Sequence, residues 1–552
     1  MSLRAPLFYQ IPEQTIQVAR AAFPKGNPYM RMRDALGPIY TNPDFAHLFP
    51  KEGQPAEAPA HLALVTIMQF AEGLSDAQAA DAVRGRIDWK YALALELTDP
   101  GFDSSVLSEF RSRLIAGQAE LLLFEQMLTL FRERKLLKAR GRQRTDSTHV
   151  LAAIQVLNRL ECVGEALRQA LNRVAALAPD WLQRWVPAEW FDRYSHRFEE
   201  YRLPPGKAER YALAEHIGAD GRQFLLALYD PTAPSHLRAL PAVETLRRVW
   251  LQQFYAAPAD EPMRWRAADD LPPGPLLISS PYDPDARYSK KRHTEWVGYK
   301  VHLTETCDED TPNLITDVTT TPATTLDFPV LATIQQNLAE RAVLPSEQLV
   351  DAGYMAADQF QASRTDHQID LVGPIAENRS WQTRQEDGLG AAQFIIDWEA
   401  KQATCPQGKT SVGWYERQSR HGRELIQIRF AKEDCAACSV RSCCTEATTQ
   451  GRSIQVRSPE HVASLQEARE RQRQDEFAQR YARRAGVEGT IAQGVSRSDL
   501  RRSRYRGFAK TRLLHILIGA ALNFVRVAAW LAEVPRSQTY CSPFAALAPT
   551  SG

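Results

Sequence analysis

Apolar residues recur at helical spacing over the first 140 residues of the chain. The segment His61–Glu72 shows this spacing most clearly. Ser75, followed three residues later by Gln78, predicts a capping box that opens a helix over Asp76–Val83. We therefore predict a helical N-terminal domain over residues 1–140. Helical content alone would serve DNA binding and simple packing equally well.

At Thr145 the pattern changes to that of a β-strand, and it soon returns to that of helices. Between Leu157 and Leu177 the apolar residues recur at intervals of three, four or seven, which predicts an amphipathic helix. Helical patterns continue to about Tyr255. We predict a helical insertion over residues 151–270, placed after the first strand.

Strand signals return at Gly298–Thr304, where apolar and polar residues alternate. The same kinds of pattern predict strands at Asn313–Thr321, Gln348–Asp351 and Ile369–Ile375, and a helix at Phe328–Ala342. A three-stranded meander followed by alternating strands and helices is typical of an α/β domain with a mixed sheet.

The composition fits a soluble globular protein of several domains, with 552 residues, 44% hydrophobic and 24% charged. The N-terminus has no apolar run of the kind found in secretory signals. The segment Thr511–Val534 is strongly apolar, but His515, Asn523 and Arg526 would be costly in a bilayer core. We expect a buried C-terminal helix and a cytoplasmic protein.

The charge is unevenly distributed, although the formal net charge is only +1. Residues 477–515 contain ten Lys and Arg against two acidic residues, and residues 131–145 contain seven against one Glu. Such runs are usually solvated surface. Both runs flank the carboxylates described next, however, which favours contact with a nucleic acid backbone.

Three carboxylates, Asp146, Asp351 and Glu488, lie in contexts that suit metal-dependent chemistry. Asp146 lies in a β-prone run, and Asp351 ends a predicted strand, two residues before Gly353. Glu488 follows Tyr481 and Arg484 by seven and four residues, which predicts one shared helix face. Two aspartates and a glutamate suit a pair of hard divalent cations, and such a pair suits phosphodiester cleavage. Alone, Glu488 would be interpreted as an exposed glutamate paired with Arg484.

The spacing Tyr481-x2-Arg484-x3-Glu488 resembles the signature of DDE insertion-sequence transposases. Further stretches resemble the same family, in chain order: residues 74–76, 89–93, 102–114, 298–303, 487–491 and 504–507. The signature expects a Lys seven residues after the Glu, where this chain has Val495. If a basic residue contacts the DNA at this place, it must be Arg497, Arg501 or Arg502.

The resemblance implies an RNase H-like catalytic core over residues 141–379 and 456–535. Asp146, Asp351 and Glu488 would bind two Mg²⁺ ions, with Mn²⁺ as an alternative. The implied reaction is cleavage at the element ends, followed by attack of the freed 3′-hydroxyl on target DNA. The residues expected to bind DNA are Tyr481, Arg484, Arg497, Arg501, Arg502, Arg504 and Lys300. The implied partners are terminal inverted repeats and target DNA in the nucleoid, bound by a homodimer or larger assembly.

Two alternatives remain open at the level of sequence. The first is a metal-dependent nuclease of the same fold that performs no strand transfer. The second is a DNA-binding protein descended from a transposase that has lost catalysis, although its carboxylates are intact.

Asp351 and Glu488 are 488 − 351 = 137 residues apart, more than a compact RNase H-like core needs, so we predict an insertion at 380–455. Five cysteines fall within it: Cys405, Cys435, Cys438, Cys443 and Cys444. In a cytosolic protein this spacing favours structural zinc over disulfides. The expected zinc ligands are Cys405, Cys435, Cys438 and one of the pair Cys443 and Cys444. The resemblance favours Cys444. Buried reduced thiols are the alternative. Residues 536–552 are expected to be a C-terminal tail.

Overall fold

The computed structural model describes residues 2–3, 9–155, 157–255, 258, 261–375, 380–418 and 424–536. The predicted tail therefore lies almost wholly outside the described residues. The chain divides into two compact units. The first unit comprises residues 1–138, 146–325 and 487–552, and the second comprises residues 139–145 and 326–486.

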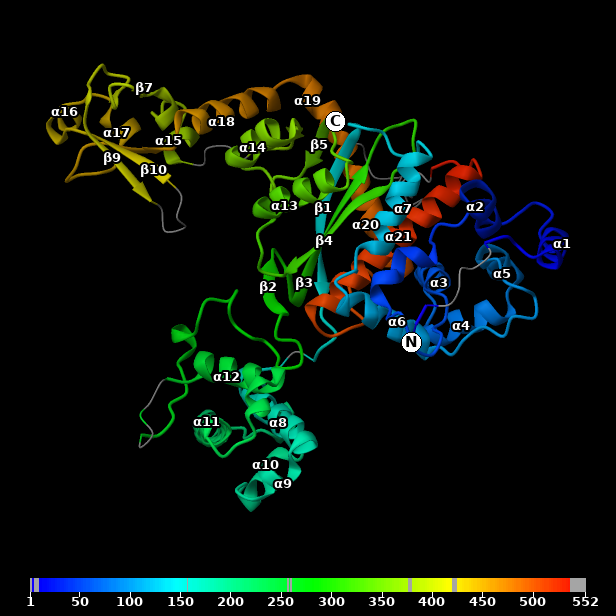
Figure 1. Cartoon of the computed structure of the whole chain (residues 1–552). Coiled ribbons are helices and arrows are strands. Elements are labelled where there is room, and N and C mark those ends of the chain that lie inside the picture. The colour runs from blue at the N-terminus through cyan, green and yellow to red at the C-terminus, as the bar shows by residue number, and fades with distance from the viewer. Residues whose placement is uncertain are drawn as a thin grey trace, which may run out of the picture. The chain divides into compact units, whose positions relative to one another are not determined.

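The N-terminal part of the first unit is helical, as predicted (Figure 1). The predicted capping box is confirmed: the Ser75 N–H donates to Gln78 Oε1 (2.9 Å), and the Gln78 N–H donates to Ser75 Oγ (3.3 Å). The helices are α1 Glu13–Ala22, α2 Pro28–Leu36, α3 Pro59–Glu72, α4 Asp76–Gly85, α5 Ile87–Leu93, α6 Ser105–Ala116 and α7 Leu122–Glu133, with the 3-10 helix η1 Asn42–Leu48.

Two residues of the N-terminal motifs tie these helices together. Arg111 on α6 is 6% exposed and donates to both carboxylate oxygens of Asp76 on α4, at 3.0 and 2.6 Å. Gln69 on α3 donates to the same carboxylate at 2.7 Å. A bidentate Arg–carboxylate pair fixes orientation as well as distance. These motif residues therefore have a structural role in joining α3, α4 and α6.

The mixed α/β class predicted from the sequence is confirmed. The strands are β1 Arg142–Leu151, β2 Arg287–Lys291, β3 Thr294–Thr306, β4 Ile315–Pro322, β5 Glu347–Val350 and β6 Asp370–Val372. Their order is β2-β3-β1-β5-β6, with β4 also paired to β3. The pairs β2–β3 and β3–β4 are antiparallel, whereas β1–β5 and β5–β6 are parallel. The helices α13 Asp327–Glu340 and α14 Ala357–His367 follow in the second unit.

Strand β3 differs from its prediction, because its polar residues are buried as deeply as its apolar ones. His302 and Thr304 are both 0% exposed, like Tyr299 and Val301. The His302 Nε2 atom lies 3.1 Å from Thr321 Oγ1 on β4, so a cross-strand hydrogen bond offsets the loss of water. Alternation along a strand identifies its two faces and does not reveal that both are covered.

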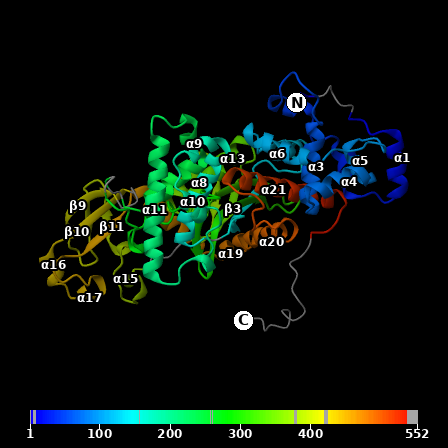
Figure 2. The same ribbon diagram turned by 90° about the horizontal axis from the view of Figure 1, so that it is seen from below.

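Helix α21, Phe508–Leu531, is the buried C-terminal helix predicted from the sequence. It lies beside α3 within the first unit (Figure 2) and packs on β4. The Asn523 amide accepts from the Ile315 N–H (2.7 Å) and donates to the Ile315 carbonyl (2.8 Å), capping the start of β4. By length and composition α21 is apolar enough to cross a membrane, but 78% of its apolar window is buried inside the protein.

The predicted helical insertion is present as a bundle with a hydrophobic core of its own (Figure 1). Its elements are α8 Arg159–Leu177, α9 Pro179–Gln183, α10 Ala188–Tyr194, η2 Glu200–Arg202, α11 Lys207–Tyr229, η3 Ser235–Ala239 and α12 Pro241–Gln253, followed by η4 Ala268–Asp270. Helices α11 and α12 meet at Gly221, where a Cβ would lie 2.0 Å from the Trp250 ring. A side chain at residue 221 would therefore force the two helices apart.

The cysteine-containing region of the second unit is a small β-structure. Its strands are β7 Ile395–Asp397, β8 Gln402–Thr404, β9 Ser411–Gln418, β10 Glu424–Phe430 and β11 Ser453–Val456. The short helices α15 Trp381–Arg384, η5 Ala391–Gln393, α16 Lys432–Ala436 and α17 Arg441–Cys444 accompany them, and α18 Pro459–Gln472 and α19 Asp475–Ala482 follow. Strands β9, β10 and β11 form one antiparallel sheet.

Candidate active site and cysteine cluster

Strand β1 begins three residues before its predicted start. It pairs in parallel with β5, and two of the predicted carboxylates directly follow the paired residues. The ladder pairs Arg142–Thr145 with Glu347–Val350. Gln348 Nε2 donates to Thr145 Oγ1 at 2.9 Å, which fixes the register from the side chains as well. The last pair is Thr145 with Val350, and the next residues in sequence are Asp146 and Asp351.

Asp146 and Asp351 sit in different surroundings. Asp146 is 8% exposed and accepts a hydrogen bond from the Ser147 N–H (2.8 Å). Asp351 is half-buried, and its Oδ1 accepts from the Gly353 N–H (2.9 Å).

A further carboxylate, Asp327 at the start of α13, lies near Asp351 and was missed in the sequence. A Cβ at Gly353 would lie 3.1 Å from Asp327 Oδ2 and 3.1 Å from Asp351 Oδ1. These two oxygens are therefore at most 6.2 Å apart, the sum of the two distances. The glycine that follows Asp351 leaves the room in which the two carboxylates approach each other.

Tyr481, Arg484 and Glu488 do not lie on one continuous α-helix, so that part of the sequence prediction is wrong. Tyr481 ends α19, Arg484 lies in the 3-10 turn η6 Arg483–Ala485, and Glu488 lies in the first turn of α20 Gly486–Ser498. The Arg483 carbonyl accepts from the N–H of Gly486, three residues on, and from Arg144 Nη1 at 2.7 Å. A short 3-10 segment within a helical run often marks a functional position.

Arg144 on β1 was not identified as a site residue in the sequence. Its guanidinium packs against Gly486, where a Cβ would lie 1.9 Å from Nη1. Arg144 thus links β1 to the helical turn that precedes Glu488. The sequence offers one hint of this link: Arg144 and Gly486 each precede a predicted catalytic carboxylate by two residues.

Within the first unit, Arg526 of α21 anchors α20, the helix that carries Glu488. Its guanidinium donates to Glu305 Oε2 on β3 (2.7 Å), to Thr490 Oγ1 (2.6 Å) and to Gln493 Oε1 (2.9 Å). Thr490 also donates to Glu305 (2.6 Å). Glu305 is 0% exposed. Glu488, two residues before Thr490, is exposed on a helix that is held from its buried side.

The residues predicted to bind DNA fall into two groups. Arg497, Arg501, Arg502 and Arg504 are exposed, whereas Tyr481, Arg484 and Lys300 are half-buried. Lys300 donates to the Thr325 carbonyl (2.7 Å), and the Tyr481 ring stacks on Phe477 with centroids 5.6 Å apart. Arg501 Nε donates to Thr148 Oγ1 (2.8 Å). Thr148 is two residues beyond Asp146 on β1, so both side chains leave the strand on the same face.

Three of the four predicted zinc ligands pack against one small apolar core. Cys405, Cys435 and Cys444 surround the buried side chains of Phe394, Ile428 and Phe430. Burial raises the pKa of the Cys444 thiol; nearby Arg452 lowers it, and Cys435, Cys438 and Cys405 raise it further. Cys405, Cys435 and Cys438 therefore lie close enough to Cys444 to affect its thiol electrostatically.

Backbone hydrogen bonds also order the chain around these cysteines. The Lys409 N–H donates to Cys405 Sγ and the Arg452 N–H donates to Cys435 Sγ, both at 3.3 Å. The Cys438 N–H donates to the Cys435 carbonyl (3.4 Å). In the described ranges of the chain, however, no group of three or more His, Cys, Asp or Glu side chains is arranged as a ready-made metal site.

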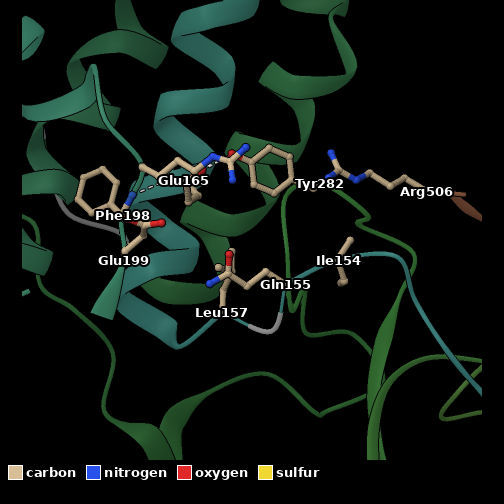
Figure 3. Close-up of a pocket in the computed structure, with 9 residues that line it drawn as sticks. Ile154, Gln155, Leu157, Glu165, Phe198, Glu199, Tyr282 and Arg506 are labelled. Atoms are coloured by element: carbon tan, nitrogen blue, oxygen red, sulfur yellow. Dashed lines mark hydrogen bonds between the residues drawn. The ribbon is translucent and has the colours of Figure 1, made fainter. Parts of the chain in front are cut away.

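A small pocket opens in the helical insertion, between α8 and the loop at Tyr282 (Figure 3). Its buried Glu165 accepts from Arg168 (2.8 Å), from the Tyr282 hydroxyl and from the Phe198 N–H (2.7 Å). Burial opposes ionisation of Glu165, but these donors outweigh it and lower its pKa. Because its carboxylate is fully engaged by the protein, we assign Glu165 a structural role.

Comparison with known families gives two matches, in chain order. A family described as a transposase domain (DUF772) matches residues 17–113, and a transposase DDE domain matches residues 404–528. No curated protein and no solved structure shows significant similarity to the chain. The first match covers the Asp76 and Arg111 motifs, and the second covers Tyr481, Arg484 and Glu488. The DDE domain implies an RNase H-like core for the mixed sheet. Together the two matches support an insertion-sequence DDE transposase.

Proposed function

We propose that this transposase cleaves DNA at the ends of its element and joins the freed 3′-hydroxyl to target DNA. The observation that carries the proposal is the β1–β5 ladder, whose last pair is followed in sequence by Asp146 and Asp351. Glu488 lies within the range of the matched DDE domain and is exposed on an anchored helix. Asp146, Asp351 and Glu488 are the proposed catalytic residues.

The donor set of the three carboxylates fits Mg²⁺, which prefers oxygen ligands, and Mn²⁺ would serve as well. Two such ions would supply electrostatic stabilisation of the attacking and leaving oxygens of the phosphodiester. Asp327, near Asp351, adds a fourth carboxylate that would help to hold a cation. The carboxylates also orient a water or a 3′-hydroxyl for in-line attack, with no covalent link between enzyme and DNA.

The basic residues around Glu488 are the proposed DNA contacts. Arg484 and Tyr481 hold the phosphate near the cut, because a guanidinium can bind two phosphate oxygens at once. The proposed contacts along the DNA backbone are the exposed Arg497, Arg501, Arg502 and Arg504, together with Lys300. Arg501 replaces the signature Lys missing at Val495, since it lies beside Thr148 on the Asp146 face of β1.

Cys405, Cys435, Cys438 and Cys444 are the proposed ligands of a structural zinc ion. Two of these sulfurs already accept backbone N–H bonds, which stabilise thiolates. Cys444 is favoured over Cys443 because it packs against the same core as Cys405 and Cys435. The ion would hold β8, α16 and α17 together. We also propose that the protein acts in the cytoplasm on nucleoid DNA, as a homodimer or larger assembly.

The test uses the purified full chain, labelled element ends taken from the DNA that flanks the gene, and a plasmid target. Wild-type protein with Mg²⁺ should nick the ends and join pre-cleaved ends to the plasmid. Asp351→Asn should abolish both steps and still bind the ends. Asp366→Asn, an exposed aspartate on α14, is the matched control and should leave both unchanged.

The two alternatives predict different results. Cleavage without joining of pre-cleaved ends would identify a nuclease. Binding of ends with neither cleavage nor joining by the wild-type protein would identify a DNA-binding protein that has lost catalysis. Either result would overturn the proposed function.

A further inference from the structure

The hairpin formed by β2 and β3 ends in a short exposed ribbon at the β2 edge of the mixed sheet (Figure 1). A two-residue turn of Arg292 and His293 joins the two strands, and the register pairs Lys291 with Thr294 and Lys290 with Glu295. Residues 290–295, here called the hairpin tip, are all exposed. The tip therefore buries little surface and contributes little to the core.

The hairpin tip carries three consecutive cations, Lys290, Lys291 and Arg292, against the single carboxylate of Glu295. Lys290 Nζ donates to Glu295 Oε1 across the strands at 2.5 Å, and this pairing holds the pKa of Glu295 below its usual range. Within the described residues, the side chains of Lys291 and Arg292 have neither a hydrogen-bond partner nor an ion-pair partner. Two adjacent unpaired cations on an exposed ribbon are suited to a polyanion.

The turn at the hairpin tip holds Arg292 in an unusual backbone conformation. Its φ is +56°, in the left-handed region that glycine and asparagine usually occupy in two-residue hairpin turns. An arginine at this position gives up backbone stability that a glycine would keep, and it places a guanidinium at the turn. Residues held in such conformations cluster at sites where the side chain has a function.

The base of the hairpin is fixed to strand β1. Trp296, next to the tip, is 5% exposed, and its indole N–H donates to the Tyr299 carbonyl (3.1 Å). Its ring centroid lies 5.6 Å from that of His149 on β1. The Ala152 N–H, directly after β1, donates to the Val297 carbonyl (3.0 Å). A ribbon with a fixed base holds its charged end in position before a ligand arrives, which lowers the entropic cost of binding.

We propose that the hairpin tip binds the phosphate backbone of a DNA duplex, with Lys291 and Arg292 as its contacts. A two-stranded ribbon is narrow enough to enter the major groove of B-DNA, which brings a cationic tip close to the backbone. Phosphate contacts carry no base sequence, so the tip binds element ends and unrelated DNA alike. The tip is separate from the DNA contacts proposed above, which lie at residue 300 and between residues 481 and 504. The inference rests on the proposed function only in taking DNA as the ligand.

The first test measures, without Mg²⁺ and across a salt series, the Kd of the full-length protein for two labelled duplexes of equal length. One duplex is an element end and the other has an unrelated sequence. Lys291→Gln/Arg292→Gln should make the slope of log K against log salt shallower by about 0.9 for each lost phosphate contact, on both duplexes. Lys207→Gln/Arg173→Gln is the matched control: it removes the same two charges from exposed residues of the helical insertion, and it should leave both slopes unchanged.

The second test uses three single substitutions to separate the charge of the tip from its fold. Arg292→Lys keeps the charge and should keep the wild-type salt slope. Arg292→Gly suits the left-handed turn, so it should keep or raise the melting temperature while it makes the slope shallower by about 0.9. Glu295→Gln removes the carboxylate of the tip and releases Lys290, so it should lower the Kd for both duplexes. A melting curve for each variant verifies that it is folded.

The inference is overturned if Lys291→Gln/Arg292→Gln keeps the wild-type slopes, or if the control makes them equally shallow. An effect on the element end alone would also overturn it, because that result indicates sequence readout. Its failure is distinguishable from failure of the proposed function. A wild-type protein that cleaves and joins element ends while the tip variants bind normally removes only this inference. A wild-type protein that binds neither duplex removes both.

Discussion

Arg526 on α21 donates to the carboxylate of Glu305 on β3 at 2.7 Å, and the two residues are 221 positions apart in the chain. Glu305 is 0% exposed. A charge so deeply buried is tolerated only with a partner, and loss of that partner leaves the charge uncompensated. This pair therefore connects the stability of the first unit to the placement of α20.

We predict that Arg526→Met will destabilise the protein by about 3–5 kcal/mol, because the buried Glu305 loses its arginine partner. Arg526→Met/Glu305→Gln should recover much of that loss, since no buried charge remains. Urea unfolding of both variants measures the difference. Equal stability of the single and double variants would show that the pair is not coupled.

Stability should also fall at acid pH because of His515. Burial lowers the pKa of His515 to about 3, whereas an unfolded histidine titrates near 6.5. Between these values the unfolded chain binds a proton that the native state does not. This residue should therefore remove up to about 1.4 kcal/mol of stability per pH unit as the pH falls from about 6 to 3.

The measurement for His515 compares unfolding free energies of wild type and His515→Gln between pH 7 and pH 4. As the pH falls, the unfolding free energy of the wild type should decrease more than that of His515→Gln. At pH 7 the variant should be less stable, because the wild-type imidazole Nδ1 lies 2.8 Å from Thr320 Oγ1 in a hydrogen bond. A pH-independent difference would contradict the assignment.

For the cysteine cluster, we predict one zinc ion per chain in protein purified without chelators. Cys435→Ser and Cys444→Ser should each lose the metal and lower the melting temperature, because structural zinc contributes directly to folding. Cys162→Ser, a buried cysteine outside the cluster, is the control for metal content. Elemental analysis that finds no zinc in the wild type would favour reduced thiols.

Gly486→Ala should separate catalysis from binding. A Cβ at this position would lie 1.9 Å from Arg144 Nη1, so the arginine must give up its bond to the Arg483 carbonyl. We expect end cleavage to fall at least tenfold while affinity for the ends changes little, because the turn before Glu488 shifts. Gly489→Ala is the matched control, since no atom lies within 4 Å of its Cβ position. Similar cleavage rates for the two variants would exclude this role.

The local sequence determined those helices and strands whose own residues show the periodicity, caps and turns of the element. The helices α3 and α4, the capping box at Ser75 and the strands β1, β4 and β5 follow from periodicity, caps and turns over fewer than fifteen residues. The resemblance to DDE transposases was also accessible from sequence, because the motifs that carry it are short and run in chain order. The helical insertion was predicted for the same reason, since α8 and its neighbours are strongly amphipathic.

Tertiary structure decided what depends on contacts between distant residues. The carbonyl of Arg483 is shared with Arg144, 339 positions away, at the 3-10 turn that divides α19 from α20. His302 and Thr304 are buried because both faces of β3 are covered, which alternation cannot reveal. Asp327 and Asp351 both place a carboxylate oxygen beside Gly353, which has no side chain to crowd them. Local patterns report the conformation of a segment, whereas burial, ion pairs and the approach of carboxylates are set by which segments meet.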